Sequence, residues 1–150
     1  MAFNYKAFNQ VVGLFEDACN RHLAINTFEC GTIDKLDYTR VNIYYPYVFL
    51  RPLSSTGLQN NVRQLTFELY SLDVPKLTES DWTLVMADTE QYVYDIVSYF
   101  RDGAYQQELW VDLLNITPVN EAFNDRVYGW VSTLQYNEEG VYNYCDFPQV

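Results

Sequence analysis

Histidine and cysteine, the residues that most often hold metal ions, are scarce in this chain. His22 is the single histidine, and the three cysteines (Cys19, Cys30 and Cys145) are widely spaced with no CxxC pair. Because metal sites need clustered histidine, cysteine or carboxylate ligands, we predict no metal site. The odd number of cysteines favours free thiols in a reducing compartment. We expect Cys19 to be a small buried hydrophobic residue and His22 to be a hydrogen-bonded, partly buried side chain.

The local motifs of common enzymes are missing as well. The chain has no GxSxG elbow, no Walker loop and no GxGxxG fingerprint after a strand, so we predict no catalytic residues and no cofactor. Two carboxylate pairs, Asp88 with Glu90 and Glu138 with Glu139, are expected to be solvated charge rather than acid/base couples. A hydrolase whose site is assembled around His22 from distant residues remains an alternative.

Cationic residues are few relative to acids. The chain has 9 lysines and arginines against 20 aspartates and glutamates, which gives a net charge of -11. The average field of such a chain repels free nucleic acid, so a sequence-reading DNA-binding protein is excluded. An acidic surface is still compatible with a channel through which DNA slides without sticking. The other interpretation is that the acidity keeps a subunit soluble before it assembles.

Long apolar runs are also missing. No stretch approaches the length of a membrane-spanning helix, and the first ten residues, MAFNYKAFNQ, lack the basic start and apolar run of a signal peptide. We therefore expect a soluble protein with no membrane partner, made in a cytoplasm.

What the chain does have is length for one domain and an excess of tyrosine. Its 150 residues predict a single domain, 1–150, and 14 of them are tyrosine, against 9 phenylalanines and 3 tryptophans. Tyrosine suits surfaces that are wet in a monomer and buried in an assembly, but it is also a good strand former. A docking surface and a tyrosine-rich sheet core are both consistent with this composition.

Two segments have helical periodicity. In the first, apolar residues recur at three- and four-residue steps from Phe8 to His22. In the second, an apolar stripe extends from Trp82 to Phe100, preceded by a capping box formed by Thr78 and Asp81 and followed by Gly103 as a C-cap.

Four segments are strand candidates, and a fifth is a short possibility. The four are 41–53, 62–73, 109–114 and 127–136, and the short one lies within 23–28. Because Pro46 interrupts 41–53, either the firm strand begins after it at 47–50 or the segment is an edge strand. Residues 54–61 are predicted as a polar hairpin loop and 116–125 as a loop containing Pro118. In 62–73, alternation places Leu65, Phe67 and Leu69 on one side and Gln64, Thr66 and Glu68 on the other.

The order of these elements is helix, hairpin, helix, hairpin. It predicts an α+β fold, a two-layer sandwich in which a mainly antiparallel sheet of about four strands carries two helices on one face. The other face, with its Thr, Gln, Glu, Tyr and Trp side chains, is expected to meet solvent or partners.

Four short pieces resemble the tail-terminator, tail-completion and head–tail connector (neck ring) proteins of tailed bacteriophages. They are YPYVFL (45–50), LTFELYSLD (65–73), DTEQYVYDIV (88–97) and FNDRVYGWV (123–131). The likeness covers the later two-thirds of the chain and includes the order of elements. The Asn- and Tyr-rich style is also similar to that of crAss-like phages.

The resemblance implies a virion structural protein that is assembled in the cytoplasm of a host bacterium. Such proteins form closed six- or twelve-fold rings in the neck or at the top of the tail, contact portal, connector or tail proteins, and surround the DNA channel. No catalytic residue is implied. A ring subunit needs two different contact patches, and we expect aromatic and loop residues to supply them: Tyr128, Trp130, Tyr136, Tyr142, Tyr144, Leu58 and Asn60. For Trp130, ordinary core packing is an equal alternative.

Two further expectations concern charge and function. If acidic residues line the channel, the candidates are Asp34, Asp37, Glu138 and Glu139. The alternative function is a soluble acidic phage-encoded module that binds or inhibits a basic host protein. Such a module would be absent from purified virions.

Overall fold

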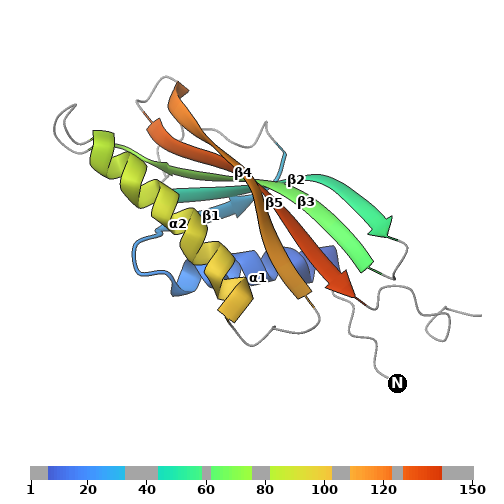
Figure 1. The fold of residues 1–150 in the computed structure, drawn as a ribbon. Helices are drawn as coiled ribbons and strands as arrows, with labels where there is room; N and C mark the ends of the chain where they lie inside the picture. Colours follow the sequence, from blue (N-terminus) through green and yellow to red (C-terminus); the bar gives the residue numbers. More distant parts are fainter. Residues whose placement is uncertain are drawn as a thin grey trace, which may run out of the picture.

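The structure, a computed structural model, describes residues 7–32, 44–58, 62–75, 82–102, 109–122 and 127–139. It has an α+β architecture of two helices and five strands (Figure 1). In chain order the elements are α1 (Phe8–Arg21), β1 (Thr27–Cys30), β2 (Tyr47–Leu58), β3 (Val62–Asp73), α2 (Trp82–Asp102), β4 (Leu109–Ala122) and β5 (Val127–Glu139).

The five strands form one mixed sheet in the order β1-β2-β3-β5-β4. The pairs β2–β3, β3–β5 and β5–β4 are antiparallel, whereas β1 is parallel to β2. The expected antiparallel character is therefore confirmed for most of the sheet, but the expected number of strands was one too few. The additional strand, β1, is held beside the start of β2 because the backbone N–H groups of Asn26 and Thr27 donate to the carbonyl of Pro46.

Both helices pack on the same face of the sheet. Phe15 of α1 lies with its ring centroid 5.3 Å from that of Phe67 on β3 and 4.7 Å from that of Phe100 on α2. Figure 1 shows α2 crossing the strands diagonally. The ring of Phe100 in turn lies 6.4 Å from that of Tyr136 on β5. The main core is thus a helix–sheet interface, as the apolar stripes of the two helical segments predict.

The helical predictions agree with the structure over most of their length, but the first residue of each predicted stripe, Phe8 in α1 and Trp82 in α2, is exposed. In α1, Val11, Phe15, Ala18 and Cys19 are buried. In α2, the buried stripe comprises Val85, Met86, Thr89, Val93, Ile96, Val97 and Phe100. The capping residues Thr78 and Asp81 and the C-cap Gly103 lie outside the described residues.

Two segments predicted as loops are strand instead. Residues 54–58 continue β2, with Ser54 opposite Thr66 and Thr56 opposite Gln64 of β3. The predicted loop at 116–125 is largely strand, since β4 continues through Pro118 as far as Ala122. Proline is tolerated there because β4 is an edge strand, where a missing N–H breaks no ladder hydrogen bond.

The face of the sheet opposite the helices, here called the second face, is not uniformly polar. At one end it holds a small apolar cluster of Tyr47, Phe49, Leu72 and Val127, all with no exposed surface, with Tyr70 packed against it. The polar residues Gln64, Thr66 and Glu68 lie on the same face and are half-buried. Their predicted orientation away from Leu65, Phe67 and Leu69 is confirmed.

Candidate functional site

The aromatic residues of β5 lie on the helix-facing side of the sheet. Tyr136 has no exposed surface and belongs to the main core, so its assignment as a subunit-contact residue is wrong. Trp130 is half-buried, and its Nε1–H donates to the carbonyl oxygen of Met86 on α2 over 2.8 Å. Tyr128 is half-buried on the same side of β5. Core packing, the alternative given equal weight for Trp130, therefore fits the helix-facing side of β5 better than a docking surface does.

The other predicted contact residues are not placed by the structure. Leu58 is the last residue of β2, and its side chain is outside the described part. Asn60, Tyr142 and Tyr144 also lie outside the described residues. Their role in subunit contact stays a prediction.

The acidic residues proposed to line a channel differ in burial. Glu138 is only 2% exposed, accepts a hydrogen bond from Tyr136 and forms an ion pair with Arg63 at 3.2 Å. The predictions of a solvated or channel-lining Glu138 are therefore wrong. Glu139 is exposed, and Asp34 and Asp37 lie outside the described residues. A buried carboxylate needs such partners, since desolvation of an unpaired charge costs several kcal/mol.

Polar side chains form a cross-strand chain on the second face. Arg51 of β2 lies directly opposite Glu68 of β3 and donates to its Oε1 over 3.2 Å, while the Tyr70 hydroxyl donates to Oε2 over 2.8 Å. Partial burial, together with the Glu68 carboxylate, raises the pKa of Tyr70 above its ordinary value. This chain holds the phenol protonated and fixes the three side chains on a half-buried surface.

A second polar chain crosses the same face further along. Gln64 Nε2 donates to Asn137 Oδ1 over 2.9 Å, and Asn137 Nδ2 donates to Asp112 Oδ2 on β4 over 3.3 Å. Three strands, β3, β5 and β4, are thus joined by side chains as well as by backbone. The sequence signal for these chains is weak, because alternation indicates which residues share a face but the strand register decides which of them meet.

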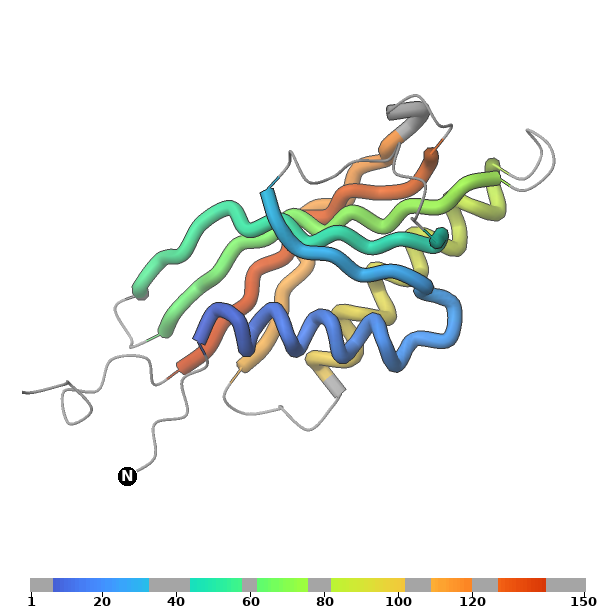
Figure 2. Tube along the Cα trace, turned by 180° about the vertical axis from the view of Figure 1, so that it is seen from behind, coloured from blue at the N-terminus to red at the C-terminus, as the bar shows by residue number. Residues whose placement is uncertain are grey.

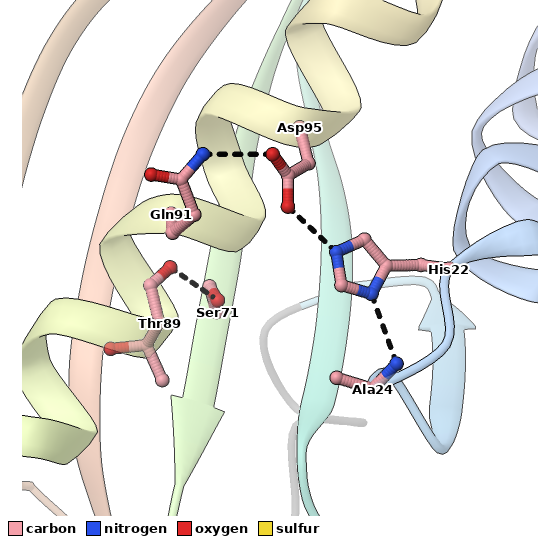
Figure 3. Close-up of polar contacts among 6 residues, drawn as sticks. All are labelled: His22, Ala24, Ser71, Thr89, Gln91 and Asp95. Atoms are coloured by element: carbon pink, nitrogen blue, oxygen red, sulfur yellow. Dashed lines mark hydrogen bonds and ion pairs between the residues drawn. The ribbon is translucent and has the colours of Figure 1, made fainter.

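His22 joins the end of α1 to α2 (Figure 3). The Ala24 N–H donates to Nδ1 over 3.1 Å, so the ring proton is on Nε2, which donates to Asp95 Oδ2 over 2.8 Å. Gln91 donates to the other carboxylate oxygen of Asp95 over 2.8 Å. The expectation of a hydrogen-bonded, partly buried histidine is confirmed. Both ring nitrogens are thus engaged in hydrogen bonds within the chain.

A second polar contact joins the same two helices. The Tyr99 hydroxyl donates to Asp17 over 2.5 Å, and Arg21 also donates to this carboxylate over 3.1 Å. The Tyr99 hydrogen bond is the main reason that the pKa of Asp17 lies below its usual value. Asp17 and Asp95 are therefore carboxylates that position helices.

In the part of the chain that the structure describes, no three His, Cys, Asp or Glu side chains gather to hold a metal ion. Among the same residues, no helix is both long enough and apolar enough to cross a membrane. No protein-family model matches the chain, and no curated protein matches it.

The sheet has two open margins, which are the clearest interaction surfaces of the described chain. One is β4, the last strand in the sheet order, with Trp110 36% and Leu114 53% exposed. The other is the later half of β2, because β1 pairs only with Tyr47–Leu50. Figure 2 shows β2 and β3 extending beyond the end of β1. Sequence reasoning allowed for an edge strand at 41–53 but assigned 54–58 of β2 and 116–122 of β4 to loops, so it did not find the full margins.

Proposed function

We propose that this protein is a structural subunit of a tailed-phage virion, one that forms a ring in the neck or at the top of the tail. The ring joins the head or portal to the tail and surrounds the DNA channel. The proposal contains no catalytic step. The protein acts by binding copies of itself and the portal, connector or tail proteins on either side.

The observation that carries the proposal is the one-sided covering of the sheet. Both helices pack on one face, while the polar chains centred on Glu68 and Asn137 lie on the other. A ring subunit needs two different contact patches that recur by rotation. A sheet backed on one side, with a second face and two unlike margins, supplies such patches.

The order of the elements also supports the proposal. The sequence α1, β2–β3 hairpin, α2, β4–β5 hairpin is the order that the resemblance to small phage proteins implies. Residues from three of the four resembling pieces meet in space, because Ser71 donates to the carbonyl of Thr89 and lies opposite Trp130 in the β3–β5 register. These residues pack α2 on the sheet, so the likeness concerns the scaffold rather than a reactive site.

The net charge fits a passage for DNA. A ring built from chains of charge -11 presents DNA with a repulsive average field. DNA would then slide through without the counterion release that drives tight binding.

Mass spectrometry of purified virions tests the proposal. We expect the protein at a fixed copy number per particle. Its absence from particles, together with capture of a basic host protein, would instead support the alternative of an acidic inhibitory module.

A matched pair of variants connects the test to the second face. Glu68 on β3 lies directly opposite Thr133 on β5. The variant Thr133→Arg places a cation beside this carboxylate, so we expect the protein to remain folded. We expect this variant to lower incorporation into particles. Ser98→Arg, an exposed position on α2, is the control and should leave incorporation unchanged.

A further inference from the structure

The two open margins of the sheet differ in length. In the described chain, Arg51–Leu58 of β2 pairs with β3 on one side and with no strand on the other. On the far side of the sheet, β5 is the single strand among the described residues that pairs with β4. Backbone N–H and C=O groups on such margins can template the addition of another strand.

Pro52 and Pro118 limit the length of each margin that can hydrogen-bond to an added strand, because proline has no backbone N–H. Gly31 N–H donates to the carbonyl of Leu50, so the backbone groups of Leu50 point away from β3. With a period of two residues, Pro52 points the same way, and its missing N–H falls on the open side. On β4, Pro118 occupies the corresponding edge position. The proline-free stretches that remain are Leu53–Leu58 and Leu109–Thr117.

Charge, the usual protection of an open edge, is sparse on both margins. Residues 53–58 of β2 contain no Asp, Glu, Lys or Arg, and the proline-free stretch Leu109–Thr117 of β4 contains one such residue, Asp112, although the whole chain has a net charge of -11. Proteins commonly place charged side chains on edges to prevent strand addition. Between two copies of so acidic a chain, margins with so few charged side chains are where approach costs least repulsion. Leu53 on one margin and Leu114 on the other are 43% and 53% exposed.

The strand directions determine how two copies would meet. Because the three consecutive pairs β2–β3, β3–β5 and β5–β4 are all antiparallel, β4 runs opposite to β2. Rotation about an axis along the strands keeps each strand direction, so β4 of one copy would meet β2 of the next in the antiparallel sense. Antiparallel pairs form the more stable ladder.

We propose that β4 of one subunit pairs with Leu53–Leu58 of β2 in the next, which makes the sheets of the ring continuous. The occupant of each margin is a second copy of this chain. The contact is heterologous, with two unlike margins, so it continues from copy to copy beyond a dimer and forms a ring when the rotation between copies closes. This inference rests on the proposed ring function and specifies its subunit contact.

Site-directed crosslinking tests the pairing. Ser54 and Asn115 are exposed and lie on the second face, opposite Thr66 and Thr133 respectively. Ser54→Cys and Asn115→Cys are made separately in a chain carrying Cys30→Ser and Cys145→Ser, with the buried Cys19 retained. A short bismaleimide should join the two variants when they are mixed, and neither variant alone. Asn20→Cys mixed with Ser98→Cys, both exposed on helices, is the control and should give no product.

A charge pair provides a second readout. Ser54→Glu with Asn115→Glu in one chain should abolish assembly, and Ser54→Lys with Asn115→Glu should restore it. If oligomers form but give no mixed crosslink and do not respond to the charge substitutions, the edge pairing is wrong. The proposal of a ring would still stand in that case. Asn115→Cys linking to itself would also overturn it, in favour of a β4–β4 dimer. A chain that stays monomeric throughout, both alone and mixed with portal and tail proteins, would overturn both proposals.

Discussion

At the scale of single residues, Gly129 is the position where the fold leaves no room for a side chain. It lies on β5 opposite Leu72 with a φ of 155°, and a Cβ there would lie 1.9 Å from the carbonyl oxygen of Ser71. The neighbouring Trp130 anchors α2 through Met86. The Gly-Trp pair thus brings β3, β5 and α2 into close contact.

Gly129→Ala should therefore destabilise the protein severely. The strand must shift and the residue must hold an unfavourable backbone conformation, which together cost on the order of 3 kcal/mol or more. Gly13→Ala is the matched control, since nothing lies within 4 Å of a Cβ at this α1 position. That variant should gain roughly 0.5–1 kcal/mol from helix propensity. Urea unfolding followed by circular dichroism measures both, and equal midpoints for the two variants would refute this description of Gly129.

Cys19 provides a prediction about reactivity and pH. Burial raises the pKa of its thiol from 9.0 to about 12. The thiol form is thus favoured by folding, and this stabilisation is complete below pH 9 and is lost as the pH rises toward 12. We expect iodoacetamide to leave Cys19 unmodified in the folded protein at pH 8 and to modify it in urea. Peptide mass spectrometry reads the result, and rapid modification of the folded protein would contradict the burial.

At the scale of elements, the ion pair between Arg63 and Glu138 joins the start of β3 to the end of β5. Arg63 is 11% and Glu138 2% exposed at the side chain. Removal of one partner leaves a buried charge without its counter-ion, a change that typically costs about 3–5 kcal/mol.

Glu138→Gln and Arg63→Met should each lower the free energy of unfolding by an amount in that range. The double variant should recover part of the loss, because no uncompensated charge remains. Thermal unfolding of the three proteins measures the coupling. Strictly additive losses would show that the pair does not act as a unit.

Elements with a strong apolar period were predictable from sequence, and those defined by pairing were not. The stripe from Val85 to Phe100 identifies α2 because its own residues form the buried face. Ser54, Ser55 and Thr56 are exposed and polar, so only their pairing with β3 makes them strand. That pairing is a tertiary property, which no local pattern in 52–58 encodes.

The candidate contact residues on β5 were misjudged for a related reason. Alternation separates Trp130, Leu134 and Tyr136 from Val131 and Thr133, but aromatic residues suit either a core or an interface. In the structure the helices pack on the side of the sheet that holds Tyr136, so this side is core. The polar chains on the second face depend on strand register, as between Arg51 and Glu68, and therefore became visible only in the structure.

At the scale of the whole molecule, we propose that copies of this chain build a closed ring. The basis is a helix-backed sheet with a second face and two margins of opposite strand direction that carry few charged side chains. Like charge opposes association of chains with a net charge of -11, so assembly should strengthen as added salt screens that repulsion.

Size-exclusion chromatography with light scattering tests whether this ring forms. The purified protein is examined across concentration and salt, alone and mixed with the portal and tail proteins of the phage that the proposal assigns it to. We expect one species whose mass is a fixed multiple of 17.6 kDa, formed by the protein alone or on its partner. A mass of a single chain under every condition, with no binding to portal or tail, would contradict it.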